Sequence, residues 1–172
     1  QVLSRAQMEA SATATGDFFE ATNRSHLLCC LNPAYIAGKM MLVRALVWDC
    51  PITLVEPSAN PLLSLEAQIS FVALVPLQVE AILAEEKSRL FLQAIPHVLI
   101  GGAALPHKVQ QELVHEGIRA WQSFGMTETV SHIAFTGRCR GWSITDGWSN
   151  SSAHTDGLCA MSGADCTPCE PN

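Results

Sequence analysis

The chain has 172 residues, a formal net charge of −6 from 16 acidic and 10 basic residues, and 48% hydrophobic residues. This composition suits one globular domain or a piece of a larger one, and the excess of acidic residues excludes the basic surface that nucleic-acid binding requires. The longest apolar stretches, residues 69–77 and 98–105, are too short to span a bilayer, and no signal segment opens the chain. We therefore expect no nucleic-acid partner, no membrane span and a cytoplasmic location.

Residues 1–136 alternate short apolar runs with segments of helical periodicity, at intervals suited to β–α units. The runs predict about five buried, mostly parallel strands: residues 27–31, 52–55, 71–75, 98–100 and 118–124. The periodic segments predict helices over residues 3–19, 36–47, 77–86 and 106–116, and a short polar helix before the third strand. Gly16 lies near the expected end of the first helix, and Gly117 is expected to end the last. The sequence therefore predicts an α/β fold, a mostly parallel sheet with flanking helices.

Three of the cysteines, Cys29, Cys30 and Cys50, lie in apolar surroundings that are typical of reduced, buried thiols. Successive side chains of a strand point to opposite faces of the sheet. We therefore expect Cys29 and Cys30 to pack in the core on opposite sides of the sheet.

The end of the chain differs in composition from the rest. From Gly137 onward, Ile144 and Leu158 are the only Leu, Ile or Val residues. So little apolar surface cannot offset the entropy of ordering the chain. We therefore expect a partial domain over residues 1–136 and a disordered, loosely attached or out-of-frame tail over residues 137–172. The tail contains ligand types that suit zinc, but their spacing does not match common zinc modules, so we expect no zinc site from His154, Cys159, Cys166 and Cys169.

Two glycine-containing turns follow neighbouring predicted strands, at the edge where open parallel sheets bind ligands. The first turn contains Gly101-Gly102. Glycine lets a flat or phosphorylated ligand approach the backbone and permits a tight turn, although a purely structural turn is the commoner role of such a pair.

The second turn lies in residues 122–129, Gln-Ser-Phe-Gly-Met-Thr-Glu-Thr. Phe124 can stack on a base, Thr127 can donate to a phosphate oxygen, and Glu128 can hold Mg²⁺, which prefers oxygen ligands. A polar loop, or a helix that begins with Thr127 as its cap, explains the same residues equally well.

Residues 122–129 resemble the aromatic-Gly-Met-Thr-Glu signature of the acyl-adenylate-forming enzymes, which include acyl-CoA synthetases, luciferases and peptide-synthetase adenylation domains. Residues 101–106, Gly-Gly-Ala-Ala-Leu-Pro, are similar to the adenine-binding turn of this family, and residues 72–76, Val-Ala-Leu-Val-Pro, to its Val-Pro strand end. The three motifs occur in the family's order. The resemblance covers roughly residues 1–136 and implies part of the AMP-binding, large N-terminal domain of an acyl-CoA synthetase.

Residues 31–38, Leu-Asn-Pro-Ala-Tyr-Ile-Ala-Gly, resemble the segment beside the family's acyl pocket, where many members have a histidine in place of Tyr35. Together with Lys39-Met40-Met41 and Arg44, this variant looks most like the o-succinylbenzoate-CoA ligases of menaquinone biosynthesis. The resemblance implies acyl-substrate contacts from Tyr35, Ala37 and Gly38. Lys39 is a candidate partner for the second carboxylate of the substrate, although a surface lysine is the commoner interpretation.

The resemblance also implies a reaction in two steps. A carboxylic acid attacks the α-phosphate of Mg-ATP to form an acyl-adenylate and pyrophosphate, and coenzyme A then displaces AMP. ATP and coenzyme A are thus substrates and Mg²⁺ is the metal, with Glu128 as its ligand and with Thr127 and Glu128 as the catalytic residues. The implied nucleotide-binding residues are Gly101, Gly102, Ala103, Gln122, Ser123, Phe124, Gly125, Met126 and Thr127.

Several parts of the family's pattern are missing from the chain: the phosphate loop, the ribose-binding Asp, the hinge and the small C-terminal domain with its catalytic Lys. Charge stabilisation on the transferring phosphoryl group is usually the largest catalytic term, so we expect the chain alone to be inactive. Two alternatives to a succinylbenzoate ligase stay open: a fatty- or aryl-acid CoA ligase, and a non-catalytic remnant that at most binds adenine nucleotide. A partial sheet exposes edges and apolar faces, which favours self-association.

Overall fold

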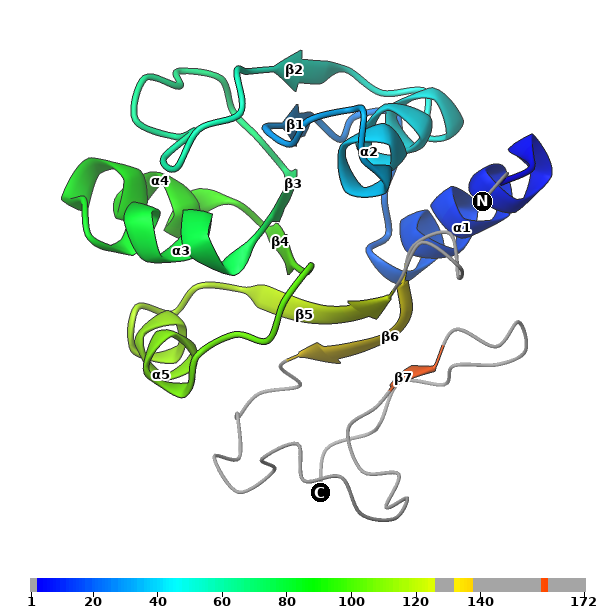
Figure 1. Ribbon diagram of the computed structural model, residues 1–172. Coiled ribbons are helices and arrows are strands. Elements are labelled where there is room, and N and C mark those ends of the chain that lie inside the picture. Colours follow the sequence, from blue (N-terminus) through cyan, green and yellow to red (C-terminus); the bar gives the residue numbers. More distant parts are fainter. Residues whose placement is uncertain (1–2, 126–131, 138–158, 161–172) are drawn as a thin grey trace, which may run out of the picture.

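The computed structural model describes residues 3–125, 132–137 and 159–160. Its centre is a seven-stranded sheet with the order β2-β1-β3-β4-β5-β6-β7 (Figure 1). The strands are β1 (Leu27–Cys29), β2 (Ile52–Leu54), β3 (Phe71–Leu74), β4 (His97–Ile100), β5 (Ala120–Gly125), β6 (His132–Gly137) and β7 (Cys159–Ala160). The helices are α1 (Arg5–Phe18), α2 (Ile36–Val47), α3 (Pro76–Leu83), α4 (Glu86–Ala94) and α5 (His107–His115).

The first five strands run parallel to one another, which confirms the predicted α/β fold with a mostly parallel sheet. The strands β6 and β7, which the sequence did not predict, extend the sheet in antiparallel fashion from β5. β7 falls within the predicted tail, where Ala160 lies opposite Ala134 of β6. Gly137, the first residue of the predicted tail, ends β6, and the remaining tail residues, including His154, Cys166 and Cys169, lie outside the described part of the chain.

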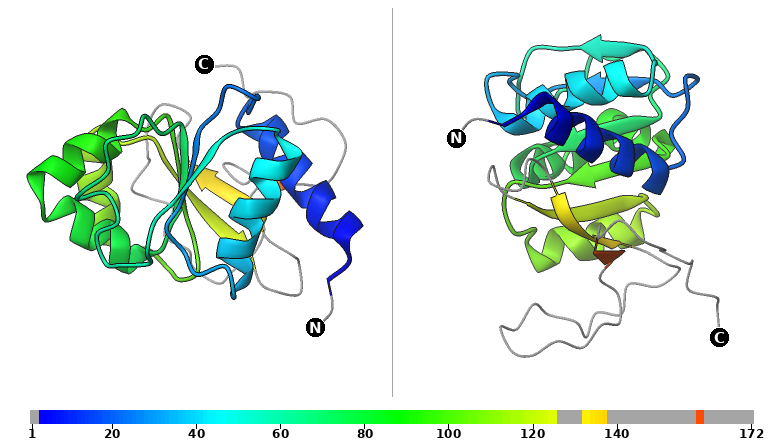
Figure 2. Two further views of the ribbon diagram at one scale, coloured as in Figure 1. Left: turned by 90° about the horizontal axis from the view of Figure 1, so that it is seen from above. Right: turned by 90° about the vertical axis from the view of Figure 1, so that its right-hand side faces the viewer.

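The helices cover both faces of the sheet: α3, α4 and α5 lie on one side, and α1 and α2 on the other (Figure 2). Alternate strand residues point to each side. On the first side, the strand residues in the buried cluster are Leu28, Val72, Leu74, Val98, Ile100 and Ala120. On the second side they are Leu27, Cys29, Phe71, Ala73 and Leu99. Cys30 belongs to the first cluster and Cys29 to the second, which confirms that these neighbours pack on opposite faces.

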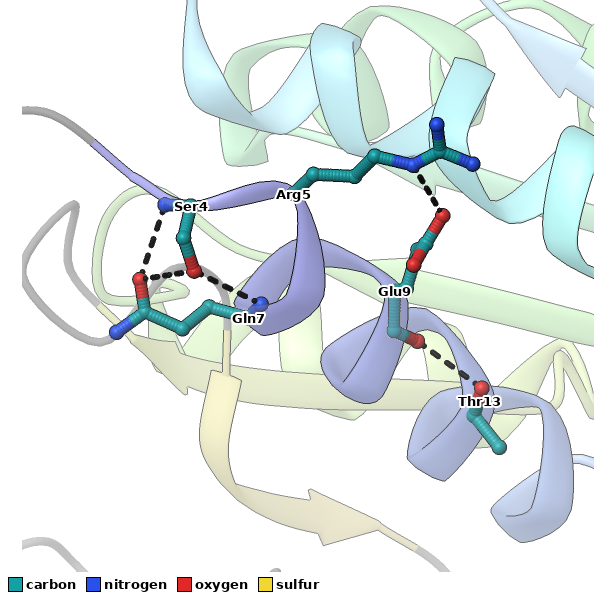
Figure 3. Close-up of polar contacts among 5 residues, drawn as sticks. All are labelled: Ser4, Arg5, Gln7, Glu9 and Thr13. Atoms are coloured by element: carbon teal, nitrogen blue, oxygen red, sulfur yellow. Dashed lines mark hydrogen bonds and ion pairs between the residues drawn. The ribbon is translucent and has the colours of Figure 1, made fainter.

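Helix α1 begins at a reciprocal cap. The backbone N–H of Gln7 donates to Ser4 Oγ at 3.2 Å, and the backbone N–H of Ser4 donates to Gln7 Oε1 at 3.0 Å (Figure 3). Arg5, the first residue of the helix, forms an exposed ion pair at 2.7 Å with Glu9, one turn further along. The cap satisfies backbone donors that a helix start leaves without intrahelical partners.

The prediction that Gly16 lies near the end of the first helix is confirmed, because α1 ends two residues later, at Phe18. Packing also requires glycine at this position. A Cβ at this position would lie 2.5 Å from Nε1 of Trp48, whose indole N–H donates to the carbonyl of Ala12 at 2.9 Å. The missing side chain therefore lets the Trp48 ring lie directly against α1.

Two helix predictions are wrong between β2 and β4. Residues 61–64, in the segment predicted to hold a short polar helix, form a turn in which the backbone N–H of Leu62 donates to Asn60 Oδ1. The helix predicted over residues 77–86 ends at Leu83, and α4 follows as a separate helix that the sequence did not predict. The break occurs because Glu85 caps the new helix: its carboxylate accepts the backbone N–H groups of Lys87 and Ser88.

His97, at the start of β4, is expected to make the fold sensitive to mild acid. Its ring lies 5.3 Å from that of Phe19, and its pKa is lowered by burial and by Arg119, against a smaller opposite effect of Glu20. A histidine whose pKa is lower in the folded state binds its proton more readily in the unfolded state. The free energy of unfolding should therefore decrease as the pH falls below about 6.5, the usual pKa of histidine in an unfolded chain.

Urea unfolding of the wild type and of His97→Gln at pH 7.5 and pH 5.5 measures this effect. The wild type should lose more stability between the two pH values than the variant does. An equal loss in both proteins would show that other groups cause the acid sensitivity.

Candidate functional site

The carboxyl ends of three neighbouring parallel strands form one edge of the sheet. Leu74 of β3 pairs with Ile100 of β4, and Ile100 pairs with Gln122 of β5. The turns that follow β3 and β4 therefore begin side by side, next to β5, which continues to Gly125. Open parallel sheets bind ligands at such an edge.

Gly101 is held close to both neighbouring strands. Its backbone N–H donates to the carbonyl of Leu74 at 3.0 Å. A Cβ on Gly101 would lie 2.5 Å from Oγ of Ser123, and that hydroxyl donates to the carbonyl of Ile100 at 3.3 Å. Two residues predicted to bind nucleotide, Gly101 and Ser123, are thus in direct contact.

At Gly102, the backbone conformation is what favours glycine. Its φ of +88° lies in the left-handed region, which side chains rarely adopt. It is exposed, as is Ala103, and a Cβ on Gly102 would meet only Cγ1 of Val75, at 3.5 Å. The turn therefore presents backbone to solvent at the edge of the sheet, which is the surface that a flat ligand needs.

The second predicted turn is described only at its start. Gln122 and Ser123 are half-buried, and Phe124 and Gly125 are the last residues of β5. The pairing of β5 with β6 is irregular between Phe124 and Gly125, and such irregularities are common beside functional sites. Met126, Thr127 and Glu128 lie outside the described residues, so the catalytic and Mg²⁺-binding roles stay predictions.

The predicted acyl-substrate residues lie at the start of α2, directly after β1. Tyr35 is 71% exposed, and Ala37 and Lys39 are exposed as well. Gly38 is buried and packs closely against the preceding backbone: a Cβ on Gly38 would lie 2.5 Å from the carbonyl oxygen of Asn32. β3 separates β1 from β4, so this segment shares the sheet edge with the glycine turn but lies two strands away from it.

Sequence reasoning missed one buried polar residue at this edge, Gln78. Only 5% of it is exposed, and its side-chain amide bonds to three separate backbone segments. The sequence does contain a signal for this role. Gln78 lies two positions after Pro76 and next to Val79, which belongs to the apolar face of the predicted helix. A polar residue in that position requires buried hydrogen-bond partners.

Cys29 and Cys30 are not activated as nucleophiles. Burial raises the pKa of Cys30 to about 12 and also raises the pKa of Cys29. Because the thiolate is the reactive form, burial makes these two thiols less reactive at neutral pH. Within the described ranges, no cluster of three or more His, Cys, Asp or Glu side chains is placed to hold a metal ion, and no helix is both long and apolar enough to cross a membrane.

Comparison with known proteins identifies the family. The model of the AMP-binding enzyme family matches residues 2–162. Among solved structures, an acyl-CoA synthetase (AMP-forming)/AMP-acid ligase II-like protein from Dyadobacter fermentans is 40% identical, with a TM-score of 0.75 over 78% of this chain and 39% of that one. No curated protein sequence matches.

Two o-succinylbenzoate-CoA synthetases have the same fold at lower identity. The Bacillus subtilis enzyme, in complex with ATP and magnesium ion, is 21% identical with a TM-score of 0.70, over 78% of this chain and 28% of that one. The Escherichia coli enzyme, with a bound analogue, is 24% identical with a TM-score of 0.64, over 76% and 28% of the two chains. The chain thus spans less than half of each relative.

The family match reaches residue 162, past the boundary predicted at residue 136, which itself stays a prediction. The match covers most of the chain, and the Dyadobacter relative is 40% identical over 78% of it. The predicted resemblance to adenylate-forming acyl-CoA synthetases is therefore confirmed, and the chain belongs to the AMP-binding enzyme family.

Proposed function

We propose that this chain supplies the adenine-nucleotide half of the active site of an AMP-forming acid–CoA ligase. The observation that carries the proposal is the turn after β4: Gly101 is packed against Ser123 of the neighbouring strand β5, and Gly102 and Ala103 are exposed. Adenine would lie against Gly101, Gly102 and Ala103. The residues at the end of β5 would bound the nucleotide on its other side, with the ring of Phe124 stacked on the base.

We propose the two-step reaction implied by the resemblance to acyl-CoA synthetases, with a carboxylic acid, ATP and coenzyme A as substrates. A carboxylate oxygen attacks the α-phosphorus of ATP, the bond to the bridging oxygen breaks, and pyrophosphate leaves. The sulfur of coenzyme A then attacks the acyl carbonyl carbon, and AMP leaves as the thioester forms. Thr127 would contact phosphate, and Glu128 has the carboxylate donor that suits Mg²⁺, a metal that neutralises phosphate charge when bound.

We further propose an aromatic dicarboxylate, o-succinylbenzoate, as the acid. Tyr35 and Lys39 support this choice, since both are exposed in or next to the first turn of α2, and a second carboxylate needs a cation or several donors. Two structural neighbours support it: the Escherichia coli enzyme with a bound analogue of OSB-AMS, and the Bacillus subtilis enzyme in complex with the acyl-adenylate intermediate OSB-AMP. A fatty or aryl acid is the alternative. Its affinity should not depend on Lys39, whereas that of succinylbenzoate should fall in Lys39→Met.

Isothermal titration of the chain with AMP and with Mg-ATP tests the nucleotide site. We expect saturable binding by the wild type and a Kd about 5- to 150-fold weaker in Phe124→Ala, because stacking of a base on an aromatic ring contributes about 1–3 kcal/mol. Leu90→Ala is the matched control: Leu90 is a 55% exposed apolar residue of α4, and its loss should leave the Kd unchanged.

Absence of binding by a folded wild-type chain would contradict the proposal and favour a non-catalytic remnant. Binding without turnover is the expected result for this chain alone. Pyrophosphate release with ATP, Mg²⁺ and succinylbenzoate, above that of a Glu128→Ala control, would show instead that the chain is sufficient for adenylation.

A further inference from the structure

Gln78 connects three segments of backbone at the carboxyl edge of the sheet. Its Oε1 accepts the backbone N–H of Val75 at 3.2 Å. Its Nε2 donates to the carbonyl oxygens of Ser58, at 3.0 Å, and Cys30, at 3.3 Å. The two donors and the acceptor of the amide are all used, so the side chain is held in one orientation.

The three partners lead to the two halves of the proposed site. Cys30 directly precedes the acyl segment, residues 31–38, and Ser58 lies in the connection from β2 to β3. Val75 contacts the nucleotide side: its Cγ1 lies 3.5 Å from the position that a Cβ on Gly102 would occupy. Gln78 is therefore placed between the acyl segment and the glycine turn, and it bonds to backbone on both sides.

The acyl segment is coupled to the same end of β1 by its own contacts. The Sγ of Cys29 lies 3.4 Å from the carbonyl oxygen of Leu31 and 3.8 Å from that of Gly38, and its single S–H donates to one of the two at a time. Gly38 in turn packs against the backbone of Asn32. A displacement of the Cys30 carbonyl would therefore move the acyl segment as one unit, because its two ends are joined to each other and to the strand.

We infer that Gln78 is a positioning residue that sets the distance between the acyl segment and the adenine turn. The inference rests on the proposed function. A ligand that occupies both halves, such as an acyl-adenylate, gains from its covalent link only when the two halves are held at the matching separation. A ligand that occupies one half, such as AMP, does not depend on that separation.

Two ligands therefore distinguish positioning from simple stability. AMP occupies only the nucleotide half. The acyl-sulfamoyladenosine of o-succinylbenzoate, in which a sulfamate replaces the reactive phosphate, occupies both halves. Each is titrated into the wild type, Gln78→Met and Gln78→Glu, and the folded fraction is measured by circular dichroism. Gln78→Glu keeps the side-chain volume and the acceptor for Val75, so it carries the test if Gln78→Met does not fold.

Both variants should bind the acyl-sulfamoyladenosine roughly tenfold more weakly, the effect of losing the hydrogen bonds to Cys30 and Ser58, while AMP affinity stays within about twofold. In Gln78→Glu, part of the loss should be recovered at pH 5.5 relative to pH 8, because a protonated carboxyl has an O–H that donates to one of the two carbonyls. A residue that only stabilised the fold would not change the ratio of the two affinities.

Asn60→Ala is the matched control. Asn60 lies in the same connection as Ser58, and its Nδ2 donates to Oγ of Ser88 on α4 at 2.9 Å, away from β1 and the glycine turn. Its loss should leave the ratio of the two affinities at the wild-type value. An unchanged ratio in the Gln78 variants, with AMP bound normally, would overturn the inference alone. Failure of the folded wild type to bind AMP would overturn the proposed function and this inference with it.

Discussion

Replacing Phe71 by alanine is expected to lower the free energy of unfolding by about 3–5 kcal/mol, the usual cost of truncating a buried aromatic side chain. Phe71 is 1% exposed and lies at the centre of the cluster between the sheet and helices α1 and α2. Its ring meets Phe19 at 5.2 Å and Trp48 at 5.3 Å edge to face, and the guanidinium of Arg44 lies 5.9 Å from its centroid. The substitution removes all three contacts at once.

Such a loss is a large part of the roughly 5–15 kcal/mol that stabilises a typical domain. Urea unfolding followed by circular dichroism measures it. Leu77→Ala is the control, because Leu77 is 68% exposed and its truncation should change stability by less than about 0.5 kcal/mol. A loss below about 1 kcal/mol in Phe71→Ala would contradict the packing of this cluster, since a filled core does not tolerate a cavity of that size cheaply.

Gly38→Ala is expected to destabilise the chain by about 1–3 kcal/mol, although alanine is the better helix former by roughly 0.5–1 kcal/mol. The added Cβ would lie 2.5 Å from the carbonyl oxygen of Asn32 and 2.6 Å from that of Leu31. These are backbone atoms, so relief requires movement of the connection between β1 and α2. The steric cost therefore exceeds the gain in helix propensity.

The same denaturation measurement tests this prediction. Lys39→Ala changes the neighbouring exposed residue in the same turn of α2, and its effect should stay within about 0.5 kcal/mol. A Gly38→Ala variant that is as stable as the wild type would contradict the close approach of the two backbone segments.

Much of the fold was predictable from local pattern. The helix predicted over residues 36–47 matches α2 residue for residue, and β3 and β4 each differ by one residue from the predicted strands. Strands buried on both faces need continuous apolar runs, and helices between them need one apolar face, so both are readable in a short window of sequence. The opposite placement of Cys29 and Cys30 follows from strand geometry alone.

The wrong predictions fall where a side chain bonds to nearby backbone and competes with the helical pattern. α4 begins because the Glu85 carboxylate accepts the backbone N–H groups of Lys87 and Ser88, although the preceding residues continue a helical pattern. Residues 61–64 form a turn, in which the backbone N–H of Leu62 donates to Asn60 Oδ1. In both places the apolar pattern was ambiguous, and a specific hydrogen bond decided the structure.

The sequence by itself determined the five parallel strands, most of the helices between them, the two-sided core and the three motifs by which the family is recognised, because these depend on periodicity and on residue type. Only the tertiary structure decided which residues meet. The contact of Gly101 with Ser123 depends on β4 and β5 being neighbours in the sheet. Gln78 bonds to Cys30, 48 residues away, and to Ser58, 20 residues away. Strand order and the packing of helices on the sheet set such contacts, and neither is written in the local pattern of the chain.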